Sequence, residues 1–309
     1  MRRPLVPLLL LVCSGMTIAK PVPFPVQVHF DACDDGLICF PVEVSGGRSL
    51  TFLLDTGDVH SYVTAESARE LGWPLQPVTG RDGKPIEGIV QAGERTVRLG
   101  SLNLKVRLLA FPRADLGPPK HRIVFDGAIA FTDLKDRVVQ VDYARHRLRI
   151  SDILTDSDES PLRGTLRTIT FGQHGPAILT GGPFDIDGRP VQAQIDTCYT
   201  GTLLVYDAAL SKLHLQALAG ASDRSRFFPN TDGGVTMRAA KAQNVRFADY
   251  ELGGTHPVIY LPTPKVHQPD GLFEATVGNA LLSRSVLTLD LHHMKFDVSP
   301  ASKPSPAGS

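Results

Sequence analysis

Residues 53–64 read LLDTGDVHSYVT, and residues 194–205 read QIDTCYTGTLLV. In both stretches an apolar segment runs into Asp-Thr, and a second apolar segment follows. A Gly-Arg pair precedes each Asp-Thr at the same distance, so the two stretches align without a gap at an offset of 141. Two copies of one pattern in a single chain indicate an internal repeat.

A second block of sequence recurs further along the chain. Residues 126–151, DGAIAFTDLKDRVVQVDYARHRLRIS, align with residues 274–299, EATVGNALLSRSVLTLDLHHMKFDVS, at an offset of 148. In this alignment Ala130 stands opposite Gly278. Because two separate blocks recur in the same order, the chain is predicted to contain a duplicated lobe.

The residues between these blocks predict β-structure. Short runs that alternate apolar and polar residues are broken by glycine, as in VQAGERTVRLGSLNLKVRLLAF at 90–111. The 28 Gly and 24 Pro in 309 residues favour many short strands joined by turns. We therefore predict a mainly β fold of two homologous, barrel-like lobes with short helices, related by a pseudo-twofold axis.

The composition also predicts where the lobes begin and end. The N-terminal lobe is expected over residues 20–154 and the C-terminal lobe over residues 165–299. Between them, residues 155–164 (TDSDESPLRG) are acidic, contain Pro and Gly, and have little to bury, which is typical of a linker. Residues 300–309 lack an apolar anchor and are predicted to be a disordered tail.

Residues 1–19 have the three-part layout of a secretory signal peptide. Two arginines are followed by an apolar run and then by small residues that end at Ala19, after which we expect cleavage and export. The apolar run is shorter than the ~18 residues that a membrane span needs. The alternatives are a buried core helix, an uncleaved anchor, or lipidation at Cys13, before which Val12 stands instead of a small residue.

Cys33 and Cys39 enclose the segment CDDGLIC, whose Asp-Asp-Gly is the turn chemistry of a hairpin. In an oxidising compartment these two cysteines are expected to form a disulfide. Two free thiols, or half of a zinc site that lacks its other two ligands, are the alternatives. In each case Cys198, beside the second Asp-Thr, is left over.

Charge and motifs exclude several functional classes. The formal net charge of +0 gives no basic surface for nucleic acid or an anionic membrane. The chain has no G-x-S-x-G, H-E-x-x-H, Walker A or G-x-G-x-x-G motif, and neither a metal nor another cofactor is expected. A nucleophilic Cys198 would need a histidine positioned by folding, for which the sequence offers His60, His121, His214, His256 and His267.

The repeated Asp-Thr predicts a pair of carboxyl groups. Asp55 and Asp196 each stand in a turn at the end of an apolar strand, where burying a lone carboxylate is costly. When two such turns meet, like charges at close range cannot both ionise, so the pair shares one proton. One member can then accept a proton and the other can donate one, as the hydrolysis of a carbonyl compound by water requires.

The residues after each Asp are expected to support this pair. Thr56 and Thr197 can hydrogen-bond across the axis and hold the two turns in register. Gly57 allows a close approach of the backbones and directs its N–H toward the carboxylate. In the second turn Cys198 occupies the position of that glycine, and its side chain crowds the approach.

These motifs resemble those of the aspartic proteases. LLDTG (53–57) and QIDT (194–197) are similar to the two catalytic loops of that family, and DGAIAF and TVGNAL are similar to its second conserved element. The resemblance covers nearly the whole mature chain, and the short loops are similar to those of bacterial exported, retropepsin-like members. It implies a periplasmic or extracellular endopeptidase with Asp55 and Asp196 as the catalytic residues and a water molecule between them as the nucleophile.

The resemblance also implies a binding mode for the substrate. A peptide or protein substrate is expected to lie extended under a hairpin flap, which falls near Gly83–Gly88 in the first lobe. The related turn of the second lobe is Gly233–Gly234. Because one chain carries both catalytic loops, a monomer is expected.

Departures from the family pattern leave alternatives open. Cys198 replaces a glycine, Asp58 and Tyr199 stand where Ser, Thr or Ala is usual, and Ala130 replaces the glycine kept at 278. An inward-pointing Asp58 raises the pKa of the two carboxyls, whereas we expect it to point to solvent. The alternatives to a general endopeptidase are a peptide-binding protein that has lost turnover, and a hydrolase restricted to one partner protein or to cell-envelope peptides.

Overall fold

The computed structural model describes residues 26–33, 36–80, 82–115, 125–151, 160–170, 176–225, 235–252, 254–261 and 274–301. The predicted signal peptide, residues 155–159 of the predicted linker, most of the predicted tail, and the candidates Gly233, Gly234, His121 and His267 lie outside these residues. The described chain is mainly β-structure, so the mainly β part of the predicted fold is confirmed. Its α-helices are short: α1 (Ala65–Glu70), α2 (Asp207–Lys212) and α3 (Asn279–Leu282).

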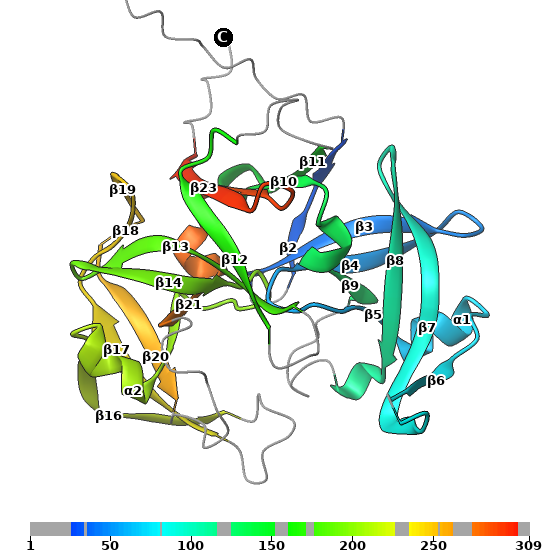
Figure 1. Cartoon of the computed structure of the whole chain (residues 1–309), viewed down its shortest axis with the longest axis horizontal. Coiled ribbons are helices and arrows are strands. Elements are labelled where there is room, and N and C mark those ends of the chain that lie inside the picture. Colours follow the sequence, from blue (N-terminus) through cyan, green and yellow to red (C-terminus); the bar gives the residue numbers. More distant parts are fainter. Residues whose placement is uncertain are drawn as a thin grey trace, which may run out of the picture.

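An eight-stranded sheet, ordered β2-β3-β4-β9-β5-β8-β7-β6, occupies the right half of Figure 1. Its strands are β2 (Asp31–Cys33), β3 (Leu37–Val44), β4 (Arg48–Asp55), β5 (Ser61–Thr64), β6 (Gln76–Thr79), β7 (Pro85–Leu99), β8 (Leu102–Phe111) and β9 (Gly127–Ala130). Burial alternates along β8, as expected for a sheet with one solvated face. The last four residues of β4 are all buried, so this strand carries Asp55 into the interior.

The remaining strands form one 15-stranded sheet in the described chain. They are β1 (Val26–His29), β10 (Val138–Asp142), β11 (Arg147–Ser151), β12 (Gly164–Thr170), β13 (Pro176–Ile186), β14 (Arg189–Ile195), β15 (Leu203–Tyr206), β16 (Gln216–Ser225), β17 (Val235–Ala242), β18 (Val245–Phe247), β19 (Tyr250–Glu251), β20 (His256–Leu261), β21 (Ala275–Val277), β22 (Ser285–Asp290) and β23 (Lys295–Pro300). Short 3-10 turns occur at η2 (Arg113–Asp115), η3 (Phe131–Leu134) and η4 (Tyr143–Arg145).

This larger sheet connects the two halves of the chain. β10, which belongs to the predicted N-terminal lobe, pairs antiparallel with β22 of the predicted C-terminal lobe, and β1 and β11 extend the same sheet. In Figure 1, β10, β11 and β23 lie above and between the two halves. The pairing buries Val139 against Leu289, and neither side chain is more than 1% exposed. The two halves are therefore joined both by the backbone pairing of β10 with β22 and by the apolar contact of their side chains.

The pattern of strand pairing next to each Asp-Thr is the same in both halves. β4 pairs parallel with β9, β5 pairs antiparallel with β9, and β5 pairs parallel with β8. In the second half β14 pairs parallel with β21, β15 antiparallel with β21, and β15 parallel with β20. Each Asp therefore stands at the end of the first strand of a parallel pair, β4 with β9 or β14 with β21. The repeated pairing agrees with the predicted duplication of the chain. The division into two lobes stays a prediction.

A small apolar cluster separates from the main core beside the Asp55 turn. We call it the satellite cluster, and its buried members are Leu37, Cys39, Leu53, Phe125 and Ala128. Cys33, Tyr62 and Cys198 are partly buried and pack against it. Cys198 is the member that comes from the second half of the chain, so the second Asp-Thr turn is anchored against apolar residues of the first half.

Cys33 and Cys39 form the predicted disulfide, which links β2 to β3 with the two Cα atoms 5.7 Å apart. The alternatives of two free thiols and of half a zinc site are therefore wrong for these residues. Cys198 is a free cysteine. Within the described ranges, no helix is both long and apolar enough to cross a membrane.

Candidate active site

Asp55 and Asp196 are held by the same local turn geometry. Asp55 ends β4, and its Oδ1 accepts hydrogen bonds from the backbone N–H groups of Gly57 (2.9 Å) and Asp58 (3.0 Å). Asp196 follows β14, and its Oδ1 accepts from the N–H groups of Cys198 (2.8 Å) and Tyr199 (3.1 Å). An Asp side chain commonly closes such a turn onto its own backbone, which explains why each strand stops here.

The two turns are bonded to each other through their threonines. Thr56 N–H donates to Thr197 Oγ1 (3.1 Å), and Thr197 N–H donates to Thr56 Oγ1 (3.0 Å). Each hydroxyl then donates onward, Thr56 Oγ1 to the carbonyl of Ile195 (2.8 Å) and Thr197 Oγ1 to the carbonyl of Leu54 (2.6 Å). Both threonines are 1% exposed. These four buried bonds fix the relative position of the two turns.

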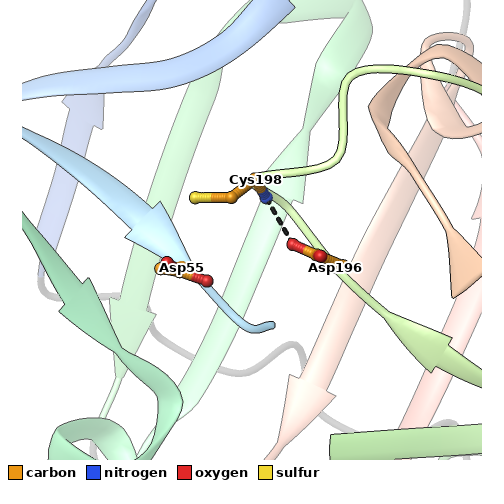
Figure 2. Close-up of side chains that lie close together, drawn as sticks. All are labelled: Asp55, Asp196 and Cys198. Carbon is orange, nitrogen blue, oxygen red and sulfur yellow. Dashed lines mark hydrogen bonds between the residues drawn. The ribbon is translucent and has the colours of Figure 1, made fainter. Parts of the chain in front are cut away.

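As a result, the carboxyl groups of Asp55 and Asp196 face each other, and the Cys198 thiol points toward the Asp55 side (Figure 2). One oxygen of each carboxyl and the Cys198 sulfur all lie within 4.8 Å of one another. Gly57 brings the first turn close to the second, because a Cβ at position 57 would lie only 2.4–2.6 Å from the Asp196 carboxyl. The three donor atoms are near enough to share a cation, but proximity alone does not assign one. The expectation of no cofactor stays a prediction.

The pKa values of the two carboxyl groups are shifted by different surroundings. Burial, the charge of Asp196 and the charge of Asp58, in that order, raise the pKa of Asp55 to about 7. Burial also raises the pKa of Asp196, although the N–H groups of Cys198 and Tyr199 oppose this shift by stabilising the carboxylate. Two close carboxyls whose pKa values are both raised can therefore share a single proton at mildly acidic pH.

Asp58 points away from the pair. Its Oδ1 accepts from the backbone N–H groups of Val59 (2.6 Å) and His60 (3.0 Å), and its side chain is 51% exposed. Burial raises the pKa of Asp58, but the hydrogen bonds from the His60 side chain and from these N–H groups outweigh burial and lower it. Asp58 thus stays charged and acts on Asp55 from a distance, rather than as a third member of the pair.

Cys198 is partly buried and behaves as a neutral thiol. Its Sγ donates a long hydrogen bond to the carbonyl of Leu54 at 3.6 Å. Burial, followed by the charges of Asp55 and Asp196, raises the pKa of the thiol well above its usual range. A nucleophilic cysteine requires the opposite shift, because the thiolate is the reactive form. The raised pKa of the thiol therefore disfavours the alternative of cysteine catalysis.

The other departures from the repeat have local explanations. A Cβ at Gly278 would lie 2.4 Å from the carbonyl oxygen of Tyr199 and 2.5 Å from that of Gly201, so this position requires glycine. Ala130, at the matching position, is accommodated in the buried strand β9, where its N–H donates to Ser61 Oγ at 2.8 Å. Tyr199 directs its hydroxyl to the carbonyl of Leu203 at 3.2 Å.

The residues expected in the first flap lie on a hairpin. Gly83 is in the turn between β6 and β7, and Gly88 is in β7; both have positive φ (+76° and +75°), which favours glycine. Both are exposed, and β6 is the edge strand of its sheet. Their contact with substrate stays a prediction.

Sequence reasoning missed one contributor to the site. Asn279, at the start of α3, is 4% exposed and donates from Nδ2 to the carbonyl of Thr197 at 2.7 Å. Its Oδ1 accepts from the Tyr143 hydroxyl at 2.8 Å. The repeat contained a signal, because Phe131 stands at the position that matches Asn279. A polar residue in only one copy of an apolar block indicates a specific partner.

Replacing Thr56 or Thr197 by valine is expected to lower the free energy of unfolding by about 2–4 kcal/mol, because each change leaves a buried N–H and a buried carbonyl without a partner. Serine at either position keeps the hydroxyl and should cost less. Urea denaturation followed by circular dichroism measures both variants. A valine variant within about 0.5 kcal/mol of the wild type would contradict the importance of these bonds.

No protein-family model matches this chain, and no curated protein matches its sequence.

Proposed function

We propose that the protein is an exported aspartic endopeptidase, which hydrolyses peptide bonds with a water molecule activated between Asp55 and Asp196. The observation that carries the proposal is the pair of facing carboxyls, each bound by two backbone N–H groups of its own turn. Two acids held this closely share a proton, and unequal acids are what general acid–base catalysis needs.

In the proposed reaction the shared proton starts on Asp55, and Asp196 starts as the carboxylate. As the water oxygen bonds to the substrate carbonyl carbon, ionised Asp196 takes a proton from the water and protonated Asp55 gives its proton to the carbonyl oxygen. The product of this step is a neutral gem-diol. Asp196 then gives its proton to the amide nitrogen, the C–N bond breaks, and Asp55 recovers a proton from one hydroxyl. Both acids return to their starting states.

Other features of the structure support the proposed lobes and the proposed export. The recurring strand pairings and the reciprocal threonine bonds support two homologous lobes over residues 20–154 and 165–299, related by an approximate twofold axis. The Cys33–Cys39 disulfide supports an oxidising compartment, as expected if residues 1–19 direct export. An extended peptide is the proposed substrate, and a monomer is the proposed state.

Incubation of the purified protein with a broad peptide library from pH 3 to 8, read by mass spectrometry, tests the function. The Asp55→Asn/Asp196→Asn double variant is the control, and cleavage of many peptides by the wild type alone supports an endopeptidase. Cleavage of one partner sequence alone supports the restricted hydrolase. Binding without cleavage, converted to cleavage by Cys198→Gly, supports the peptide-binding alternative.

Activity is expected to fall as the pH rises through about 7, because Asp55 then loses the proton that it donates. Below this point Asp55 is protonated, and activity persists until Asp196 also gains a proton. The dependence of kcat/KM on pH between 3 and 8.5 measures both limbs. Activity that keeps rising above pH 8 would exclude Asp55 as the proton donor.

A further inference from the structure

We propose that Asn279 is a positioning residue of this site: it orients the Thr197–Cys198 peptide so that the peptide N–H donates to Asp196, and thereby makes Asp196 the carboxyl that carries the negative charge. The inference rests on the proposed function, since it concerns the charge state of the same pair. That charge state can nevertheless be measured without any substrate.

The Asn279 side chain is held in a single orientation. Its Nδ2 donates to two carbonyl oxygens, that of Thr197 at 2.7 Å and that of Gly36 in the disulfide loop at 3.0 Å. Its Oδ1 accepts from the Tyr143 hydroxyl at 2.8 Å. A flipped amide would place an oxygen against both carbonyls, so only one orientation satisfies the neighbours. The buried amide is therefore a fixed donor to the Thr197 carbonyl.

That carbonyl belongs to the peptide unit that binds Asp196. The N–H of the same unit, on Cys198, donates to Asp196 Oδ1 at 2.8 Å (Figure 2). Hydrogen bonds in series polarise one another, so a donor to the carbonyl strengthens the N–H as a donor on the opposite side. A stronger donor to a carboxylate favours its charged form. The chain from Tyr143 through Asn279 and this peptide thus favours negative charge on Asp196.

At the matching position of the first half, the described chain offers no such donor. Phe131 stands opposite Asn279 in the repeat, is 4% exposed, and has no side-chain N–H to donate. Gly57 N–H still donates to Asp55 at 2.9 Å, but the matching side chain cannot polarise its peptide. The charge of Asp58 raises the pKa of both acids, and the Cys198 side chain, which hydrogen-bonds to Asp55, lowers the pKa of Asp55. The difference between the turns that favours the shared proton on Asp55 is therefore the peptide held by Asn279.

Among the described residues, six titratable residues interact with Asp196 through charge or hydrogen bonds. They belong to the two turns or to elements packed against the turns. They are Asp55, Asp58, Tyr62 on β5, Tyr143 on η4, Cys198 and Tyr199. Burial raises the pKa of the Cys198 thiol and of the tyrosine hydroxyls, so these groups are neutral below pH 8. Asp55 and Asp58 remain as the charges that compete with the effect of Asn279.

The decisive measurement is the titration of Asp196 by carboxyl ¹³C NMR in the Asp55→Asn background, where Asp196 is the remaining acid of the pair. Adding Asn279→Leu should move the titration midpoint of Asp196 to higher pH. Adding Phe131→Leu, the matched control in the first half, should leave the midpoint where it was. An unchanged midpoint in a folded Asn279→Leu protein overturns the proposal.

Tyr143→Phe provides a second variant, in case leucine at position 279 prevents folding. It removes the hydroxyl that donates to Asn279 Oδ1 and keeps the amide in place. A smaller shift of the Asp196 midpoint in the same direction is expected, and a midpoint equal to that of the Asp55→Asn parent overturns the proposal. The thermal unfolding of each variant verifies that the protein is folded under the conditions of the titration.

Kinetics in the otherwise wild-type protein separate this inference from the proposed function. Asn279→Leu should lower kcat about tenfold and leave KM within about twofold, and the acidic limb of the pH profile should move to higher pH. If no peptide is cleaved by any form of the protein but the midpoint still shifts, the endopeptidase proposal fails and the role of Asn279 stands. If peptides are cleaved and the midpoint does not shift, the endopeptidase proposal stands and the role of Asn279 fails.

Discussion

Replacing either Asp55 or Asp196 by asparagine is expected to lower kcat/KM for peptide cleavage roughly 1000-fold or more. Each variant keeps the size of the side chain but removes one of the two proton-transfer steps. Asp196→Asn removes the base that activates water, and Asp55→Asn removes the acid that protonates the carbonyl oxygen. Initial rates with a peptide found in the library measure the loss. If only one of the two variants loses activity, the proposed division of roles is wrong.

Asp55→Asn should raise stability at neutral pH although it removes activity. The pKa of Asp55 is raised from its ordinary 3.8 to about 7, so between these values the folded protein keeps a proton that the unfolded chain has lost. The free energy of unfolding contributed by this group therefore falls as the pH rises from about 4 to about 7. Asp55→Asn has no such proton and should lose less stability over this range. Urea denaturation at pH 4.5, 6 and 7.5 measures the difference, and parallel curves would contradict the raised pKa.

Gly57→Ala is expected to reduce activity by about 100-fold or more. The added Cβ would lie 2.4–2.6 Å from the Asp196 carboxyl, so the two turns have to move apart. A displacement of about 1 Å in a catalytic group is enough for a loss of this size. The matched control is Gly254→Ala, whose Cβ would meet nothing within 4 Å. Steady-state kinetics and the unfolding temperature of both variants are the measurements.

The two variants separate crowding at the site from a general effect of replacing glycine. Activity near the wild-type level in Gly57→Ala would mean that the turns tolerate a wider spacing, and that the facing carboxyls are not the reacting groups. An equal loss in Gly254→Ala would point to global destabilisation. Loss in Gly57→Ala alone, with both proteins folded, ties activity to the distance between the turns.

Local chemistry explains what could be predicted from the sequence. The Asp-Thr turns close onto backbone N–H groups two and three residues away, and the Cys33–Cys39 disulfide spans a separation of only six residues. Strand patterning gave the mainly β class for the same reason, because the alternation of burial is set by neighbours in the chain. The outward orientation of Asp58 also follows from bonds to the next two residues.

The features that could not be predicted depend on residues far apart in the chain. Asn279 bonds to Gly36 across a separation of 243 residues, and its partner Tyr143 comes from a third region. The pairing of β10 with β22, which joins the predicted lobes in one sheet, likewise has no signature in either strand alone. Such contacts depend on how whole elements pack, and periodicity carries no information about that.

The sequence by itself determined that this protein contains two copies of an acidic turn, a mainly β fold and a short disulfide loop, since each depends on residues within a few positions of one another. Only the tertiary structure decided how close the two turns lie, that burial and neighbouring charges raise the pKa of Asp55 to about 7, and that Asn279 donates to the Thr197 carbonyl of the second turn. The physical reason is that the charge state of a buried carboxyl is set by every dipole and charge around it, and folding brings those groups together from all parts of the chain.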